Sequence, residues 1–401
     1  MNIPHDKFCV LPWVSIEASP IGTVRPCCLA DDEILDNAGN KFELSTADFS
    51  DIQNSDHMRR LREQFLAGER PQTCRKCWNE ERGGRTSKRM HTLDRLKHSI
   101  EDTEWSADAK PLMFLDLKLG NICNLKCRIC GSWSSSQFAT EEINQLPREE
   151  QKSSHAYQML RAGAWPRENQ KFWQQIDSVL TDIRYIEFTG GEPFMIDEHF
   201  DMLQGIVNRG IAHQVEIHYN TNGTQYPARG EAIWRHFKTV EIAFSIDDVG
   251  ARFEYQRTNA DWAVVLDNIT SFQYLKTQLP NLQLQCCSTV NVFNVRYIDQ
   301  LAHWVAAQKF DFVYWNMMHD AWYFSIATLP DDTKAAITEH LRSADVPPQY
   351  RAEFDRIVDF MNTGASTDGF MLRMKIADLD RKRNQHLRTV EPEFADLIGY
   401  E

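Results

Sequence analysis

Three closely spaced cysteines, Cys123, Cys127 and Cys130, constrain the fold of this chain more than any other feature. The segment before them, 115–119, reads Leu-Asp-Leu-Lys-Leu, and this alternation of apolar and polar residues predicts a strand. Gly120 then ends the strand. The three thiols are therefore expected on a short loop at the carboxyl end of a strand, where α/β folds place functional groups.

Thiolates bind zinc or iron–sulfur clusters, and a closed zinc site needs a fourth ligand near the other three. The sequence has no His and no further Cys between Cys130 and His155. Three thiolates on one centre therefore favour a [4Fe–4S] cluster whose fourth iron stays open to a ligand from outside the protein.

A second motif, Gly190-Gly191-Glu192-Pro193, follows the strand-like segment 185–187. Paired glycines let a backbone approach a ligand closely, and a carbonyl oxygen or the Glu192 carboxylate accepts a hydrogen bond from an ammonium group. The motif alone is weak evidence. Its place at the end of the next strand after the cysteine loop makes it informative.

Together, the cysteine loop and the Gly-Gly-Glu-Pro motif about sixty residues later resemble the radical S-adenosylmethionine (SAM) enzymes. The resemblance implies that Cys123, Cys127 and Cys130 hold the SAM-binding [4Fe–4S] cluster. It implies that Gly190–Pro193 binds the amino group of the SAM methionine, while this amine and its carboxylate chelate the open iron.

The resemblance also assigns SAM contacts to residues beside the last cluster cysteine and at the ends of later strands: Ile129, Asn220, Thr221, Asn222, Ser245, Asp247, Arg257 and Asn291. Several of them have a structural alternative. Asn222 begins a common Asn-Gly turn, and Ser245 and Asp247 also suit a turn or a helix cap. Arg257 also suits an exposed salt bridge. Ile129 stands where relatives often carry an aromatic residue, so ring stacking on adenine is not implied there.

Six apolar segments predict strands near 112–119, 184–189, 214–220, 239–246, 282–291 and 311–318. Helical patterns alternate with them near 134–145, 169–181, 197–209, 229–237, 260–277 and 296–308. Repeated βα units predict an α/β fold with a parallel sheet and right-handed crossovers. Six units match the partial (β/α)6 TIM-like barrel of the radical SAM family, to which the resemblance extends over about 110–318.

The N-terminal region holds further cysteines, and Cys9, Cys27 or Cys28, Cys74 and Cys77 provide four ligands. Cys9 to Cys28 predicts a small hairpin with its turn at 20–22. From spacing alone, zinc and a second [4Fe–4S] cluster are about equally well supported. The pattern resembles the auxiliary-cluster module called SPASM, in its short twitch form, although that module usually follows the barrel. The resemblance favours the second cluster.

The predicted organisation is a twitch/SPASM-like module at 1–90, a linker at 91–110, the barrel at 111–329 and a helical C-terminal extension at 330–401. The basic segment 83–89 is interpreted as a solvated connector, with a substrate or phosphate contact as the alternative. Segment 146–168 has no clear period and is interpreted as an insertion. The basic, amphipathic segment 370–388 is interpreted as a helix with a solvated face.

Composition excludes several classes of protein. A formal net charge of −13 argues against general nucleic-acid binding. The N-terminus lacks the apolar core of a signal peptide, and no apolar run reaches membrane-spanning length. The ten cysteines, mostly in close groups, fit metal binding in a reducing compartment, so we expect a cytoplasmic protein.

Five residues are candidates for catalysis: Cys286, Cys287, His319, Asp320 and Tyr323. The two cysteines lie inside an apolar strand, where a free thiol usually serves as a small buried hydrophobe. Alternatively, the inward-facing thiol donates a hydrogen atom to a substrate radical. The other three follow the sixth strand, where a side chain can position substrate or move a proton.

The function implied by the resemblance is reductive cleavage of SAM to a 5′-deoxyadenosyl radical, which abstracts a substrate hydrogen. The substrate is expected to be a ribosomally made peptide that is oxidised or cross-linked, and a flavodoxin or ferredoxin type protein is expected to supply electrons. The alternatives are a dehydrogenase or epimerase of a small metabolite, a non-catalytic iron–sulfur or electron-transfer protein, and an RNA-modifying enzyme, against which the acidic balance weighs.

Overall fold

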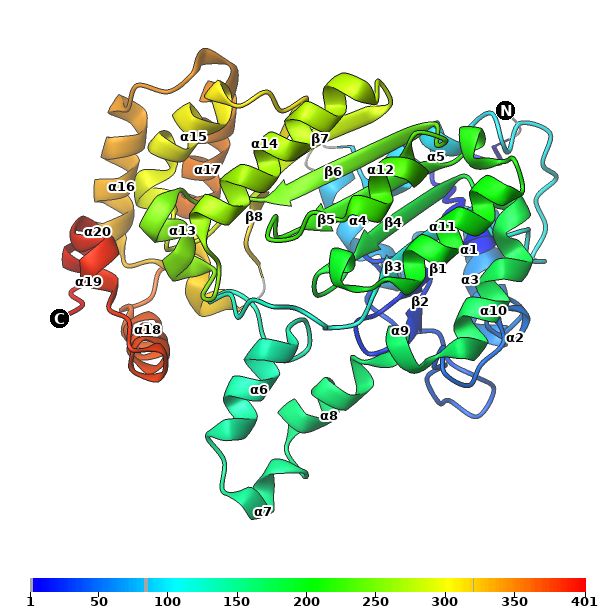
Figure 1. Ribbon diagram of the computed structural model, residues 1–401, viewed down its shortest axis with the longest axis horizontal. Helices are drawn as coiled ribbons and strands as arrows, with labels where there is room; N and C mark the ends of the chain where they lie inside the picture. The colour runs from blue at the N-terminus through cyan, green and yellow to red at the C-terminus, as the bar shows by residue number, and fades with distance from the viewer. Residues whose placement is uncertain (1–2, 83–85, 320) are drawn as a thin grey trace. The chain divides into compact units, whose positions relative to one another are not determined.

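The computed structural model describes residues 3–82, 86–319 and 321–401 (Figure 1). The chain forms two compact units. Unit 1 comprises Met1–Cys123, Ser132–Tyr219 and Pro227–Val240, and unit 2 comprises Asn124–Gly131, Asn220–Tyr226 and Glu241–Glu401. The boundary separates Cys123 from the other two cysteines of the loop. The domain limits predicted from the sequence remain predictions.

In the part of the chain that the structure describes, eight strands form one sheet in the order β2-β1-β3-β4-β5-β6-β7-β8. Their bounds are Ser15–Ala18 (β1), Val24–Arg25 (β2), Phe114–Lys118 (β3), Tyr185–Thr189 (β4), Glu216–Thr221 (β5), Thr239–Ser245 (β6), Leu282–Val290 (β7) and Phe312–Met317 (β8). β1 and β2 are antiparallel, whereas the pairs β1–β3, β3–β4, β4–β5 and β7–β8 are parallel. The six predicted strands are β3 to β8, so the α/β class and the (β/α)6 order are confirmed.

The N-terminal hairpin belongs to this sheet. Gly22, at a φ of 83°, closes its turn by donating from its backbone N–H to the carbonyl oxygen of Ser19 at 2.9 Å. Strand β1 pairs with β3 in parallel, with Ser15 opposite Phe114. The sequence predicts the hairpin but not this pairing, because no local pattern links two strands so far apart along the chain.

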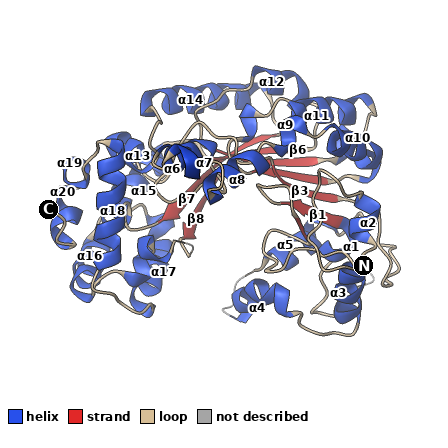
Figure 2. Cartoon of the chain, turned by 90° about the horizontal axis from the view of Figure 1, so that it is seen from below, coloured by secondary structure: helices blue, strands red, loops and turns tan. Residues whose placement is uncertain are grey.

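The sheet of unit 1 has an apolar face and a charged face. Leu115, Leu117, Ile186 and Phe188 are fully buried on the apolar face. The helices α10 (Gln170–Val179), α11 (Glu198–Asn208) and α12 (Ala228–Trp234) lie on one side of the strands in Figure 2. The His199 ring of α11 packs on Phe188 with the ring centroids 4.8 Å apart, so these helices cover the apolar face.

The charged face carries side chains that alternate with the apolar ones: Glu17 of β1, Asp116 and Lys118 of β3, and Glu187 of β4. The helices α4 (Arg75–Arg82) and α5 (Lys88–Leu96) lie on this side in Figure 2. The remaining N-terminal helices are α1 (Leu11–Val14), α2 (Phe49–Gln53) and α3 (Asp56–Leu66).

Helix α5 corrects the interpretation of the basic segment as a solvated connector. Ser87 caps the helix, because its side chain accepts from the backbone N–H of Met90. Lys88 and Arg89 are mostly buried. Each is paired with a carboxylate, and this pairing allows a basic side chain to lie away from solvent. Gly83, Gly84 and Arg85 lie outside the described residues.

The segment predicted as an insertion is helical. It contains α7 (Arg148–Gln151), α8 (His155–Ala162) and α9 (Trp165–Glu168), and it follows the predicted helix α6 (Ser136–Asn144). Figure 1 shows α6 and α8 as the arms of a hairpin with α7 at its tip. The sequence predicts only α6, because helices of four to eight residues are too short to show a clear 3.6-residue period.

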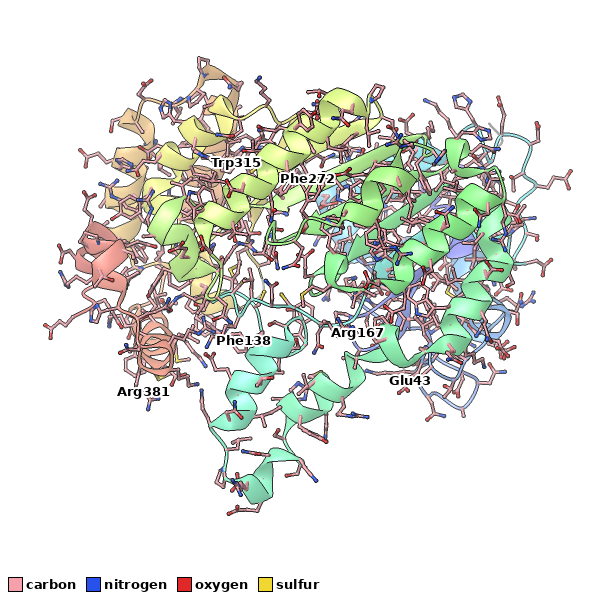
Figure 3. The ribbon with its side chains drawn as sticks, viewed as in Figure 1. Glu43, Phe138, Arg167, Phe272, Trp315 and Arg381 are labelled. Atoms are coloured by element: carbon pink, nitrogen blue, oxygen red, sulfur yellow. The ribbon has the colours of Figure 1, made fainter. Side chains whose placement is uncertain are left out.

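Unit 2 continues with α13 (Gly250–Gln256), α14 (Trp262–Gln278) and α15 (Ile298–Ala307). Phe272 of α14, labelled in Figure 3, packs on Phe244 of β6 with the ring centroids 5.3 Å apart. The C-terminal extension contains α16 (Asp331–Ser343), α17 (Arg351–Thr363), α18 (Phe370–Arg383), α19 (Leu387–Val390) and α20 (Pro392–Leu397), as predicted. Among the described helices, none has the length and apolarity that a membrane crossing requires.

Candidate functional site

Four cysteines of the N-terminal region lie near one another in unit 1. Burial raises the pKa of the Cys9 thiol well above its ordinary value, and the thiols of Cys74, Cys27 and Cys77 raise it further. Burial likewise raises the pKa of Cys74, with Cys27 and Cys77 adding to the shift. Electrostatic coupling of this kind requires proximity. Cys9 before α1, Cys27 after β2, Cys74 before α4 and Cys77 within α4 thus lie in one region, and we call these four the N-terminal thiol group.

Cys28 points to a different environment from that of Cys27. The Lys88 ammonium donates to Cys28 Sγ at 2.9 Å, to Asp116 Oδ2 at 2.8 Å and to Glu187 Oε2 at 3.0 Å. Burial raises the pKa of Cys28, and the neighbouring Asp116 carboxylate raises it further. Cys28 is therefore engaged with the charged face of the sheet.

Burial by itself raises the pKa of Asp116, but the ammonium groups of Lys88 and Lys118 bring it well below its ordinary value. The sequence analysis did not identify Asp116 and Glu187, and it considered Lys88 only as part of the basic segment 83–89. The available signal was one acidic residue in the middle of each of two mostly apolar strands.

Cys123 is held by two neighbouring segments of unit 1. Its backbone N–H donates to Ser136 Oγ at 3.1 Å, and that hydroxyl donates to the carbonyl oxygen of Cys123 at 3.1 Å. In the residues just before Cys123, the carbonyl oxygen of Gly120 accepts from the backbone N–H of Gly191 at 3.0 Å. The carbonyl oxygen of Ile122 accepts from the backbone N–H of Glu192 at 2.8 Å. The Gly-Gly-Glu-Pro motif is thus hydrogen-bonded to the segment that leads into the cysteine loop.

The close approach of these two segments requires glycine. Gly190 has a φ of 109°, and a Cβ atom on Gly191 would come within 2.2 Å of the carbonyl oxygen of Ile122. Pro193 begins a short 3-10 helix, and the fully buried Glu192 side chain accepts from the backbone N–H of Phe194 at 3.1 Å. The motif has a structural role in shaping the loop, in addition to the SAM contact expected of it.

The rest of the loop lies in unit 2. The backbone N–H of Lys126 donates to the carbonyl oxygen of Thr258 at 3.1 Å, and the backbone N–H of Arg128 donates to the carbonyl oxygen of Gln256 at 2.8 Å. A hydrogen bond between the thiols of Cys127 and Cys130 raises the pKa of Cys127, and burial raises it further. Cys127 is buried and Cys130 is exposed.

Arg257 lies against one of these thiols. Its Nη2 donates to Asp247 Oδ2 at 2.6 Å, and its Nη1 donates to Cys127 Sγ at 3.8 Å. Burial lowers the pKa of Arg257, but Asp247 and the thiols raise it, and the net shift is upward. Asp247 Oδ1 also accepts from the backbone N–H of Thr289 at 2.8 Å. The carboxylate therefore holds a charged guanidinium at the loop.

The Asn220–Asn222 segment supports the loop through side chains. Asn222 Nδ2 donates to Asn124 Oδ1 at 3.0 Å, and Asn124 Nδ2 donates to Thr224 Oγ1 at 2.8 Å. Thr221 Oγ1 accepts from the backbone N–H of Gly223 at 3.1 Å. These contacts fix the residue that follows Cys123.

The Asn291 side chain is buried and bonded within its own turn. Its Nδ2 donates to the carbonyl oxygen of Thr289 at 2.9 Å, and its Oδ1 accepts from the backbone N–H of Phe293 at 2.8 Å. Contacts of Asn291, Ser245 and Ile129 with SAM remain predictions.

The catalytic candidates are dispersed within unit 2. Strand alternation buries Cys286 completely and leaves Cys287 partly exposed, with Asn316 Nδ2 3.5 Å from its sulfur. The His319 ring contacts Phe360 edge-on at 5.2 Å, and the Tyr323 ring contacts Phe324 at 4.7 Å. Asp320 lies outside the described residues. Cys287 is thus the strand thiol that faces away from the apolar core.

A hollow of about 830 Å³ lies in unit 1, lined in part by Ile21, His57 and the half-exposed Trp133. Asp32, which also lines it, donates its backbone N–H to the Thr73 hydroxyl at 3.0 Å. Thr73 precedes Cys74, so one residue that lines the hollow is bonded to a neighbour of the N-terminal thiol group.

Four thiols form a donor set that holds zinc or one [4Fe–4S] cluster, and three thiols form one that holds a [4Fe–4S] cluster with an open iron. Within residues 3–82, 86–319 and 321–401, no three Cys, His, Asp or Glu side chains are grouped as a ready metal site. The ligand assignments therefore depend on donor chemistry and proximity.

Comparison with known proteins bears on the N-terminal region. Residues 9–78 match the SPASM family, an iron–sulfur cluster-binding domain. This match confirms the predicted SPASM-type module, favours a cluster over zinc there, and supports the resemblance to radical SAM enzymes. A search of the curated proteins finds no match.

The search of solved structures finds partial matches at low identity, among them the following three. Native anSMEcpe with bound AdoMet has 17% identity and a TM-score of 0.39, over 64% of this chain and 63% of that chain. Native anSMEcpe with bound AdoMet and the Cp18Cys peptide has 14% identity and a TM-score of 0.37, over 67% of this chain and 66% of that chain. TYW1 with a lysine-pyruvate adduct bound has 11% identity and a TM-score of 0.28, over 53% of this chain and 64% of that chain. The chain therefore spans less than two thirds of the length of each.

Proposed function

We propose that this chain is a radical SAM enzyme that oxidises or cross-links a ribosomally made peptide. One observation carries the proposal: the Gly-Gly-Glu-Pro backbone is hydrogen-bonded to the residues that lead into Cys123, and only glycine permits that approach. Two motifs that are distant in sequence therefore act as one structure, as a shared SAM site requires.

The proposed ligands of the SAM-binding cluster are Cys123, Cys127 and Cys130. The proposed ligands of the auxiliary cluster are Cys9, Cys27, Cys74 and Cys77. Cys28 is left out, because its sulfur accepts from the Lys88 ammonium at 2.9 Å on the charged face of the sheet.

When bound together, the open-iron cluster and SAM supply a 5′-deoxyadenosyl radical that abstracts a hydrogen atom from substrate. The protein has to hold SAM and keep water away from it. Gly190 and Gly191 offer backbone groups to the SAM amine, and Arg257 offers a buried positive charge beside Cys127. The SAM carboxylate is the group that best matches this charge.

A peptide substrate is supported by the SPASM match, because radical SAM enzymes with this module often act on ribosomally made peptides. Cys9, Cys27, Cys74 and Cys77 would hold an auxiliary cluster, and that cluster would supply an acceptor for the second electron of an oxidation. The hollow near the N-terminal thiol group offers room for a side chain of such a peptide. We further propose that a flavodoxin or ferredoxin type protein delivers the first electron.

The test is anaerobic reconstitution of the full chain, followed by dithionite reduction with SAM and detection of 5′-deoxyadenosine. The wild-type chain is expected to bind about eight irons and to form this product. Cys127→Ala is expected to form none and to retain about four irons. Cys28→Ala, which changes a thiol that the proposal leaves out of both ligand sets, is the matched control and should keep the activity.

Two results contradict the proposal. A fully loaded wild-type chain that forms no 5′-deoxyadenosine is an iron–sulfur binding or electron-transfer protein. A chain that binds about four irons and one zinc lacks the auxiliary cluster.

A further inference from the structure

Arg128 lies between two proposed cluster ligands and is fully buried. Its Nη2 donates to Asp380 Oδ1 at 2.6 Å and to Gln385 Oε1 at 2.9 Å, and its Nε donates to the carbonyl oxygen of Tyr255 at 2.8 Å. The guanidinium also stacks over the Tyr255 ring, 3.5 Å from its centroid. The proposed function makes no use of this residue.

The partner of Arg128 comes from the C-terminal extension. Asp380 belongs to α18, and its second oxygen accepts from Tyr400 Oη at 2.8 Å and from the backbone N–H of Leu387 at 2.8 Å. Tyr255 Oη donates to Asp380 Oδ1 at 2.8 Å. Asp380 is thus satisfied by groups from α13, from the start of α19 and from beyond α20.

The neighbours of Asp380 on α18 show that this contact is specific. Arg381 is 78% exposed and lies on the outer side of α18 (Figure 3). Asp378 is paired with Arg381 and with Lys382 at the surface. Of the two aspartates Asp378 and Asp380, it is therefore Asp380 whose carboxylate meets the cysteine loop.

A buried Arg–Asp pair contributes little to stability by itself, because desolvation offsets its attraction. The pair does fix the positions of its two side chains. If they separate, or if one is removed, a buried charge is left without compensation. Here the fixed residue is covalently next to Cys127, and its backbone N–H is bonded to Gln256 at 2.8 Å.

We propose that the C-terminal extension is a positioning element for the cysteine loop, with Arg128 and Asp380 as the positioning residues. This inference rests on the proposed function, since it assigns the loop as a cluster site. The extension therefore determines how Cys127 and Cys130 are presented, although it contributes no ligand.

The experiment compares Asp380→Asn with Asp378→Asn, the same change two residues away on the exposed side of the same helix. The first readout is amide hydrogen exchange at Lys126 and Arg128 in the full chain, before any cluster is loaded. We expect exchange at these amides to be about tenfold faster in D380N and unchanged in D378N. Arg128→Lys, which keeps the charge but lacks the guanidinium fork, should behave like D380N.

The second readout is the EPR spectrum of the reduced cluster, with and without SAM. D380N and R128K are expected to show a broadened or shifted signal and a weakened response to SAM, whereas D378N keeps the wild-type spectrum. A folding defect alone does not account for this result if the melting profile of D380N stays cooperative.

Equal exchange at Lys126 and Arg128 in the two Asp variants, or unchanged spectra of folded D380N and R128K, overturns the inference. If the wild-type chain shows no cluster signal that responds to SAM, the proposed function fails instead. The exchange comparison still decides whether Asp380 holds the loop, so the two failures are distinguishable.

Discussion

The two groups of cysteines lie in contrasting surroundings. In the N-terminal thiol group, burial is the main influence on the pKa of Cys9, Cys27 and Cys74, and it raises the pKa of Cys27 to about 11. Lys88 lowers the pKa of Cys27, but its ammonium is already bonded to Cys28 and two carboxylates. In the loop, by contrast, a buried guanidinium directly faces Cys127.

The position of the cation therefore distinguishes the two groups in how well each can accommodate additional negative charge. A cation held beside a thiolate or a cluster stabilises its more negative form. Under the proposed function, we therefore expect the loop to take up an electron and a carboxylate, and the N-terminal thiol group to hold a cluster of fixed charge. The variants below test this comparison, in order of decreasing effect.

The largest effect is expected from replacement of a proposed ligand in the N-terminal thiol group. Cys27→Ser should lose the auxiliary cluster, about four irons per chain, because a four-thiolate set then lacks one ligand. Cys28→Ser should keep all the iron, because Cys28 accepts from Lys88. Iron analysis of the two reconstituted variants makes the measurement, and equal iron contents would remove the distinction between Cys27 and Cys28.

The next effect concerns the backbone contact that holds the loop. Gly191→Ala should destabilise the chain by about 3 kcal/mol, since its Cβ would lie 2.2 Å from the carbonyl oxygen of Ile122. Gly39→Ala is the control, because Gly39 has only a positive φ and open space around it, and should cost about 1 kcal/mol. Urea unfolding of the metal-free variants measures both values. A smaller loss in G191A than in G39A contradicts the close approach.

Carboxylates in the two units predict opposite responses to pH. Burial raises the pKa of Asp248 to about 6, and the folded unit 2 therefore binds a proton more tightly than the unfolded chain. The stability that this group contributes is present below pH 4 and is lost as the pH rises through 6. Asp116 in unit 1 has the reverse sign, because its lowered pKa stabilises the fold above pH 4.

Relative to Asp248→Asn, the wild-type chain should lose about 2 kcal/mol of stability between pH 4 and pH 7. Denaturant unfolding at several pH values makes the measurement. A constant difference between the two chains would mean that Asp248 does not titrate in this range.

The smallest effect is a shift in redox potential. Arg257→Met removes the cation that faces Cys127 and leaves Asp247 without its partner, and both changes disfavour the reduced cluster. The potential of the SAM-binding cluster should fall by about 60 mV, a tenfold change for one electron. Arg296→Met, which breaks a surface pair with Glu393, is the control. A potentiometric titration followed by EPR that finds equal potentials contradicts the contrast drawn above.

Much of the fold could be predicted from the sequence, because its signals are local. The six strands β3 to β8 lie within two residues of their predicted bounds, since short apolar runs alternate with helical periods. The cysteine spacing and the Gly-Gly-Glu-Pro motif predicted one shared site, which stays a prediction, and the structure bonds the backbones of the two segments to each other. The match of residues 9–78 to SPASM confirmed the module that the N-terminal cysteines suggested.

The missed features depend on distant partners. The pairing of β1 with β3 and the bond between Arg128 and Asp380 join residues that no local pattern connects. Lys88 and Arg89 were interpreted as solvated because they are basic, yet specific acids allow them to be buried. Polar residues that fold inward are recognisable only once their partners are known.

The pairing of β1 with β3 has a practical consequence for dissection of this protein. A fragment cut between residues 90 and 110 would leave two open strand edges, one on the cysteine-rich piece and one on Phe114–Lys118. Such pieces are prone to self-association. Exchange of this module between proteins should therefore carry the third strand along with it.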